Sequence, residues 1–413
     1  YPLAMLVSAR CLLLSLLMAS AISAQGKNLL FYGNSFTYYS WGFGVPEMVG
    51  LIASEAGHAT PNIVQALIGG ATLGDHATDP AQVAIISNAL PAGETWDHVI
   101  MQGRTQEATD YGGFSRLAFR NNAVAITGNV RSHSPLASAI MYQTWAVAWG
   151  HMYYPLPWAV PLEMHEDVRL GYRLAVSDIL ATFGSGTAWN AAVGDAVALL
   201  EFDPAWYEPD LGHPSPSIIL LAAMGLYTTM YGTTVCEIDP DFTPGSALSQ
   251  ALSPFGLGAA EWDFLAGISD RSADETVRRY PGSSDQLMLE TATGSGDLTS
   301  CPAKQLTVGT QVQIRLRSMN GVYDNAAGIL MVDFFVTGSP PVLGGPFREI
   351  QVDLGGAILG PMVFLSSALT VSFPMPITLP GGSFRVQGLA WQASLESGNA
   401  LLTTTDAHEL IMF

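Results

Sequence analysis

The sequence predicts an α/β fold, a parallel sheet sandwiched by helices, followed by an all-β sandwich. Short apolar runs alternate with segments of helical periodicity from about residue 27 to about residue 232. This alternation is typical of parallel strands joined by helices. From about residue 305 onward, β-rich pieces are separated by Gly, Pro and Ser, without a helical period. The length of 413 residues also exceeds what one hydrophobic core usually supports.

The first half contains three runs that suit buried strands, at 29–32, 98–101 and 137–145. Two segments have helical periodicity. The first, 165–184, ends at a glycine, and the second, 214–232, carries proline in its first turn. We therefore expect an α/β domain over 27–235.

The last third reads "QLTVGTQVQIRLRS", "GILMVDFFVTG" and "SFRVQGLAWQAS", with similar pieces between and after these. Regular short strands without helices predict a β-sandwich, which we place at 301–413. The stretch 236–300 is expected to be a partly helical extension or linker.

The N-terminal residues 1–24 are interpreted as a signal peptide. Arg10 precedes an apolar run, 11–18, and small residues follow it. The chain is therefore expected to be secreted, periplasmic or held at the cell surface. The run is too short to span a bilayer, so no stable membrane insertion is expected.

Composition limits the partners and cofactors. The chain has 16 basic and 35 acidic residues, a net charge of −19, which disfavours nucleic acid. After removal of the signal peptide only Cys236 and Cys301 remain, and in an oxidising compartment a disulfide is favoured over free thiols or a metal site. No Cys/His cluster has zinc-ligand spacing, so we expect no metal and no cofactor.

The stretch "LLFYGNSFTYYS" places Ser35 directly after a predicted strand. A serine there, beside backbone N–H groups at the next helix start, has room for both a nucleophile and an oxyanion hole. Gly-x-Ser alone is more often structural. The stretch also differs from the Gly-x-Ser-x-Gly elbow of the α/β-hydrolases, because position 37 is threonine.

The stretch "EPDLGHPSPS" places Asp210 three residues before His213. A short loop of that spacing can turn the carboxylate onto the imidazole while the other ring nitrogen faces a serine. In isolation, a surface Asp-x-x-His in a capping turn is the commoner reading. An early serine and a late Asp-x-x-His in one α/β domain favour the catalytic one.

Together these blocks resemble the SGNH hydrolase superfamily, also called GDSL esterases and lipases. The resemblance lies in Gly33-Asn34-Ser35, in Gly70 within "IGGATLGDH", and in Asp210-Leu211-Gly212-His213. The segments "MYQTWA", "VGDAV" and "HPSPS" also resemble an uncharacterised, often secreted branch of it. The resemblance covers about half the chain, 27–232, with the blocks in the family's order.

The resemblance implies a flavodoxin-like sheet and a role for each matching residue. Ser35 would be the nucleophile, His213 the general base and then acid, and Asp210 the carboxylate that orients it. The backbone N–H groups of Ser35 and Gly70 would stabilise the oxyanion.

One block departs from the family's pattern. Where most members have Gly-x-Asn after the third strand, this chain has "VIMQGRTQE". Gln102 is the candidate third oxyanion donor, because its amide can donate as asparagine does. A strict alignment instead puts Arg104 at the asparagine position, and Gln106 is a further alternative.

Other residues are candidates for lining the pocket: Asn34, His76, Arg104, Gln106 and Trp145. His76 follows the proposed oxyanion glycine, although a packing or surface histidine is the commoner reading. Trp145 lies past a strand where it could stack on a sugar, although an aromatic there is more often core.

The function expected from these residues is that of a secreted serine esterase that removes small acyl groups, such as acetyl, from polysaccharide. A lipid or polyester hydrolase is a neighbouring alternative. A different class is an exported glycan-binding or cell-surface protein whose hydrolase domain has lost competence, because the third block is altered. The sequence predicts no oligomeric state.

Overall fold

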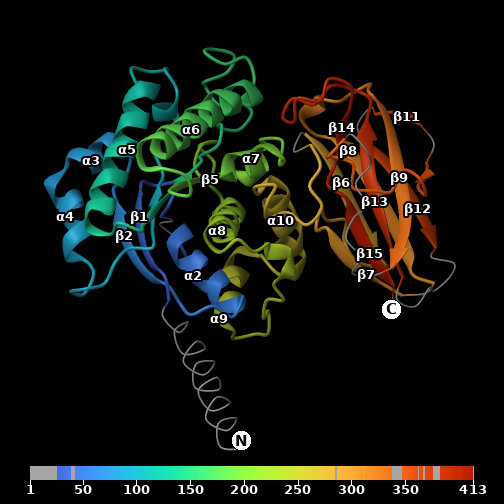
Figure 1. The fold of residues 1–413 in the computed structure, drawn as a ribbon, viewed down its shortest axis with the longest axis horizontal. Coiled ribbons are helices and arrows are strands. Elements are labelled where there is room, and N and C mark those ends of the chain that lie inside the picture. The colour runs from blue at the N-terminus through green and yellow to red at the C-terminus, as the bar shows by residue number, and fades with distance from the viewer. Residues whose placement is uncertain are drawn as a thin grey trace, which may run out of the picture.

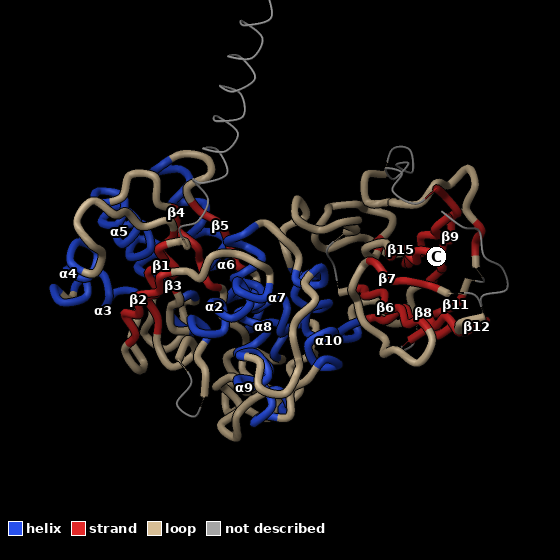
Figure 2. The backbone as a smooth tube through the Cα atoms, turned by 90° about the horizontal axis from the view of Figure 1, so that it is seen from below, coloured by secondary structure: helices blue, strands red, loops and turns tan. Residues whose placement is uncertain are grey.

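The computed structural model describes residues 26–38, 42–283, 286–307, 309–336, 347–360, 362–365, 368–374 and 382–412. The predicted signal peptide, 1–24, lies outside them. The described residues form an α/β part and a β domain that lie side by side (Figure 1, Figure 2).

The α/β part contains a five-stranded parallel sheet with the strand order β2-β1-β3-β4-β5. Its strands are β1 (Asn28–Gly33), β2 (Asn62–Leu67), β3 (His98–Met101), β4 (Ser138–Tyr142) and β5 (Ala188–Ala191). Every residue of β1, β3 and β4 is buried. This is the flavodoxin-like order, in which the connections from β1 to β2 and from β2 to β3 run in opposite directions, and a crevice opens beyond the carboxyl ends of β1 and β3. The predicted α/β fold is confirmed.

Helices cover both faces of this sheet (Figure 1). On one side α5 packs against α6, and on the other α2 packs against α8. The helices are α2 (Val45–Glu55), α3 (Leu73–Thr78), α4 (Pro80–Asn88), α5 (Arg116–His133), α6 (Pro161–Phe183), α7 (Val193–Ala198), α8 (Pro216–Tyr231), α9 (Ala247–Leu252) and α10 (Ala259–Ser272), with 3-10 helices η1 (Thr105–Ala108), η2 (Pro204–Trp206), η3 (Val235–Glu237) and η4 (Ser253–Phe255). The helix expected from residue 165 begins four residues earlier, at Pro161, because proline is preorganised for a first helical turn.

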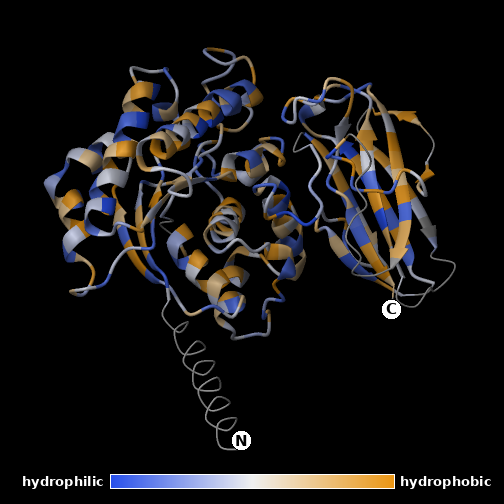
Figure 3. Cartoon of the chain, in the orientation of Figure 1, coloured by the Kyte–Doolittle hydropathy of each residue, from blue (hydrophilic) through white to orange (hydrophobic). Residues whose placement is uncertain are grey.

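The β domain contains a seven-stranded sheet and a three-stranded sheet. Its elements are β6 (Leu287–Thr293), β7 (Ala303–Leu306), β8 (Gln311–Ser318), η5 (Met319–Gly321), β9 (Ala327–Val336), β10 (Ile358–Leu359), β11 (Val363–Phe364), β12 (Ala368–Pro374), β13 (Gly382–Ala390), β14 (Thr403–Thr404) and β15 (His408–Met412). Hydrophobic and hydrophilic residues alternate along long strands such as β8, with one face in the core (Figure 3). The predicted all-β domain is confirmed.

The β domain begins before the expected boundary at residue 301. Strand β6 pairs with β8, although it lies within the stretch expected to be an extension. Six of its seven residues are buried, so it lacks the alternation that marks a half-buried strand. The rest of that stretch belongs to the α/β part, where α10 packs against α8.

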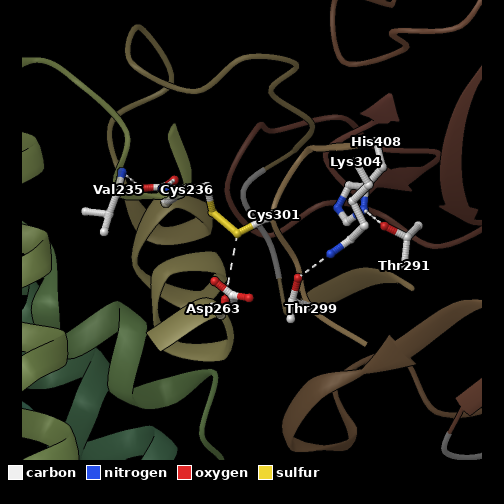
Figure 4. Close-up of a disulfide and its surroundings, with 9 residues drawn as sticks. Val235, Cys236, Asp263, Thr291, Thr299, Cys301, Lys304 and His408 are labelled. Carbon is white, nitrogen blue, oxygen red and sulfur yellow. Dashed lines mark hydrogen bonds between the residues drawn. A yellow bond between two sulfur atoms is a disulfide. The ribbon is translucent and has the colours of Figure 1, made fainter. Parts of the chain in front are cut away.

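A disulfide joins Cys236 to Cys301, as the sequence predicts, with their Cα atoms 5.7 Å apart (Figure 4). It connects η3 of the α/β part to the segment before β7. The buried carboxylate of Asp270 on α10 accepts hydrogen bonds from the N–H groups of Val235 and Cys236, both at 2.8 Å.

Ion pairs also connect the two parts. Arg169 Nη1 on α6 lies 2.6 Å from Glu396 Oε1. Arg317 Nη2 on β8 lies 3.2 Å from Glu201 Oε2. Within the described ranges, no helix is long and apolar enough to cross a membrane.

Candidate active site

The loop that carries Ser35 leaves the carboxyl end of β1 in a tight turn. Thr37 N–H donates to the Asn34 carbonyl at 2.9 Å, and the Asn34 side chain accepts from Phe36 N–H at 3.1 Å and donates to the Ala71 carbonyl at 2.9 Å. A side chain at Gly33 would collide with Thr37 Oγ1, which explains the glycine at the end of this strand. Asn34 thus fixes the loop against the segment that follows β2.

The loop that carries Asp210 and His213 precedes α8. Asp210 Oδ1 accepts from the N–H groups of Gly212, at 3.0 Å, and His213, at 2.9 Å. Its Oδ2 accepts a hydrogen bond from His213 Nδ1. Burial opposes ionisation of Asp210, but these three hydrogen bonds outweigh it and lower the pKa of the carboxyl below its ordinary value. Asp210 is therefore a carboxylate at neutral pH.

The two loops meet, and Ser35 Oγ lies 2.9 Å from His213 Nε2. Because Nδ1–H of the neutral imidazole donates to Asp210, Nε2 carries the lone pair and accepts from the serine hydroxyl. Ser35 and His213 are 178 positions apart in the sequence. This hydrogen-bond chain of Ser35, His213 and Asp210 is the arrangement in which a histidine activates a serine as nucleophile.

An aromatic layer supports His213. The Phe36 ring meets the imidazole edge-on, with centroids 5.2 Å apart, and stacks on Trp145 at 5.0 Å. Trp145 is fully buried and donates through Nε1 to the Gly212 carbonyl at 3.3 Å. Trp145 therefore lies beneath the site as core, the commoner of the two readings, and does not line the cavity as the other reading expected.

The backbone N–H groups of Ser35 and Gly70 have no acceptor among the described residues. Gly70 adopts φ of +71°, in the left-handed region that favours glycine. Both residues line the same cavity, so the two groups are available to a ligand there.

That cavity has a volume of about 310 Å³. Of the expected residues, those that line it are Asn34, Ser35, Gly70, Arg104, Gln106, Asp210 and His213. His151 and Tyr153 also line this cavity, although neither was expected there from the sequence. Both lie in the long connection between β4 and α6, where an aromatic-rich "HMYYP" was the only signal.

Gln102 lies beneath the Ser35 loop. It is fully buried, and its Oε1 accepts from Asn34 N–H at 2.8 Å and Thr37 Oγ1 at 2.9 Å. Its Nε2 donates to the Gly103 carbonyl at 2.6 Å. Gln102 thus holds the loop against β3 and is not part of the cavity wall, whereas both alternatives, Arg104 and Gln106, are.

His76 also lies beneath the strand end and does not line the cavity. It is 1% exposed and donates through Nε2 to the Gly33 carbonyl at 3.1 Å. Burial lowers its pKa, despite the hydrogen bond that opposes this. His76 is a neutral packing histidine, the commoner of the two readings.

Glu107 is a buried carboxyl group that the sequence analysis missed. It accepts from the N–H groups of Leu73, at 2.9 Å, Gly74, at 3.4 Å, and Arg104, at 3.3 Å. Burial raises its pKa to about 7, against the opposing effect of these hydrogen bonds. Glu107 therefore ties the segment after Gly70 to the loop after β3.

We expect Glu107→Gln to flatten the pH dependence of stability. Its pKa rises from 4.5 in the unfolded chain to about 7 in the folded one, so the folded state holds the proton more tightly between those values. Wild-type stability should therefore fall as pH rises through this window, by up to about 3 kcal/mol from this group. Urea unfolding at several pH values measures the difference between wild type and variant, and a difference that is constant with pH contradicts the assignment. Glu163→Gln, at an exposed position on α6, is the control.

Comparisons with known proteins show similarity at the level of structure. No family model matches the sequence, and no curated protein matches it significantly. A candidate SGNH hydrolase from Slackia heliotrinireducens is 23% identical, with a TM-score of 0.38 over 50% of this chain and 100% of that one. A DUF4886 family protein from Bacteroides uniformis is 14% identical, with a TM-score of 0.43 over 59% and 93%. A carbohydrate acetylesterase from Sinorhizobium meliloti is 16% identical, with a TM-score of 0.34 over 50% and 98%.

The five-stranded parallel sheet flanked by helices is the flavodoxin-like arrangement that the resemblance in the sequence implied. The identities and TM-scores are low, so the similarity assigns no activity to this chain.

Proposed function

We propose that the chain is a serine esterase that hydrolyses carboxylic esters through an acyl-enzyme at Ser35. The observation that carries the proposal is the 2.9 Å separation of Ser35 Oγ and His213 Nε2, with Asp210 on the other ring nitrogen. A hydrogen-bonded base makes a serine hydroxyl nucleophilic at neutral pH.

In the first half of the reaction, Ser35 Oγ attacks the ester carbonyl carbon and its proton passes to His213 Nε2. The negative charge that develops on the carbonyl oxygen is stabilised by the N–H groups of Ser35 and Gly70. As the tetrahedral intermediate collapses, His213 returns the proton to the leaving alcohol. The acyl group is then bonded to Ser35.

In the second half, water attacks the acyl-enzyme and gives its proton to His213. The carboxylic acid leaves, and Ser35 regains its proton from the imidazole. Asp210 remains a carboxylate throughout. It holds Nδ1–H and stabilises the positive charge that His213 carries in each half.

The substrate we propose is a small acyl ester, such as an acetyl group on polysaccharide. The cavity of about 310 Å³ lies at the small end of ligand pockets, which favours a short acyl group over a fatty acid. Secretion stays a prediction, and the disulfide agrees with an oxidising compartment.

A hydrolase domain that has lost its activity would be supported if Ser35 Oγ and His213 Nε2 lay beyond hydrogen-bond reach. They are 2.9 Å apart, so the geometry does not support this alternative.

Hydrolysis of a series of 4-nitrophenyl esters tests the proposal, together with measurement of acetate release from acetylated xylan. We expect the acetate and propionate esters to be cleaved faster than the octanoate. A faster octanoate reaction would support a lipid hydrolase, and no cleavage of any ester by folded protein would overturn the proposal.

A further inference from the structure

Arg104 is an isolated cation in the wall of the cavity that holds Ser35. No other lysine or arginine lines this cavity within the described residues. The chain as a whole carries 16 basic and 35 acidic residues, so its overall field repels anions. A cation at this place is therefore a local departure from the charge of the protein.

The guanidinium of Arg104 is held in place without a carboxylate. Its Nε donates to Gln106 Oε1 at 3.3 Å, and its Cζ lies 5.3 Å from the centre of the Phe114 ring. Among the ion pairs of the described residues, none includes Arg104, whereas most other arginines in these ranges have an acidic partner within 4 Å. The side chain is exposed to solvent, contacts an aromatic face and an amide, and has no carboxylate that compensates its charge.

Two acids at or beside this cavity, Glu107 and Asp210, make no ion pair with Arg104. Glu107 receives the backbone N–H of Arg104 and those of Leu73 and Gly74, and it makes no ion pair with the guanidinium. Asp210, which also lines the cavity, uses both oxygens for Gly212 and His213.

The residues beside Arg104 also present hydrogen-bond donors. Gln106 Nε2 donates to Tyr153 Oη at 2.9 Å, which leaves the Tyr153 hydroxyl proton to donate elsewhere. Tyr153 N–H donates to His151 Nδ1 at 3.2 Å, so the proton of neutral His151 is on Nε2. Burial lowers the pKa of His151, against the opposing charge of Asp210, which favours this neutral form. The wall therefore combines a guanidinium with two further donors.

We propose that Arg104, assisted by Tyr153 and His151, binds a carboxylate that the ester substrate carries near its scissile bond. This inference rests on the proposed esterase function and names its substrate class. A guanidinium forms two parallel hydrogen bonds with a carboxylate, and hydrogen bonds between charged groups are stronger than neutral ones. The carboxylate belongs to either the alcohol part, as in an acylated sugar acid, or the acyl part, as in a dicarboxylic half-ester.

Two matched pairs of esters distinguish these sources. The first pair is an O-acetylated methyl glucuronoside and the corresponding O-acetylated methyl glucoside, which differ in charge only at C6. The second is the 4-nitrophenyl half-ester of succinate and 4-nitrophenyl butyrate. We expect the wild type to have a kcat/KM about 10- to 100-fold higher for the charged member of one pair, and the pair concerned identifies the source. The preference should shrink as salt is added.

Arg104→Met should remove this preference, and Arg104→Lys should keep part of it because a cation remains. Arg120→Met is the matched control, since Arg120 on α5 pairs with Asp178 away from the cavity, and its loss changes the net charge equally. It should keep the wild-type preference. Thermal unfolding of each variant verifies that it is folded.

Three results would overturn the inference: no preference for either charged ester in the wild type, a preference that survives in Arg104→Met, or an equal loss for both members of a pair in that variant. The outcome is separable from that of the proposed function. If a neutral fluorophosphonate labels Ser35 and neutral esters are cleaved without any preference for charge, only the carboxylate site fails. If folded protein is neither labelled nor active, the esterase proposal itself fails.

Discussion

Ser35→Ala is expected to lower kcat for ester hydrolysis by about 10⁴-fold or more. In the proposed mechanism the serine oxygen forms the bond to the acyl carbon, and no neighbouring group can replace it. Removing the nucleophile or the base of such a unit costs about as much as removing all of its members. Among the described residues, the Ser35 side chain hydrogen-bonds to His213 alone, so the fold should survive the change.

Steady-state hydrolysis of 4-nitrophenyl acetate measures this loss. Ser87→Ala, at an exposed position on α4, is the matched control and should leave kcat within about twofold of wild type. If Ser35→Ala retains more than a tenth of the wild-type kcat, the reaction does not pass through Ser35.

Asp210→Asn is expected to lower kcat by about 10³- to 10⁴-fold. An asparagine amide can donate to His213 Nδ1, which would place the imidazole proton on Nε2. His213 would then be unable to accept the proton of Ser35. Because the Asp210 side chain is 53% exposed, its replacement should change the free energy of unfolding little.

The control for this change is Asp203→Asn, at a carboxylate in the preceding loop that caps η2 through Ala205 N–H. We expect it to retain wild-type kcat. A loss of less than tenfold in Asp210→Asn, with the fold intact, would show that His213 does not depend on this carboxylate for its orientation.

Three strands of the α/β part, β1, β3 and β4, are predictable because they are buried along their whole length and form continuous apolar runs in the sequence. The apolar runs at 29–32, 98–101 and 137–145 correspond to β1, β3 and β4. Strand β6 is also buried, but Glu290 and Thr291 interrupt its apolar residues, so it shows neither a continuous apolar run nor alternation, and it was not predicted. Periodicity detects a strand with one exposed face much better than one that is enclosed.

The candidate site likewise contains residues whose positions the sequence predicts and residues whose positions it does not predict. Local spacing brings Asp210 to His213, since three residues of loop are enough to return the carboxylate to the ring. The places of Gln102 and Trp145 depend on packing between segments far apart in the chain. A polar or aromatic residue after a strand can turn into the cavity or beneath it, and spacing does not distinguish these outcomes.

His151, Tyr153 and Glu107 could not be predicted from local pattern for a related reason. The first two lie in the connection between β4 and α6, whose path has no regular period. Glu107 acts through the N–H groups of a segment that is more than 30 residues away in sequence. These residues become visible only when the loops at the carboxyl edge of the sheet are placed in space.

The central claim is that His213 activates Ser35, and fluorophosphonate labelling tests it most directly. The purified protein would be treated with the probe, and the modified residue located by mass spectrometry of its peptides. We predict labelling at Ser35 in the wild type and none at Ser35 in a folded His213→Ala variant. A folded wild-type sample without a label, or with the label on another serine, would contradict the claim.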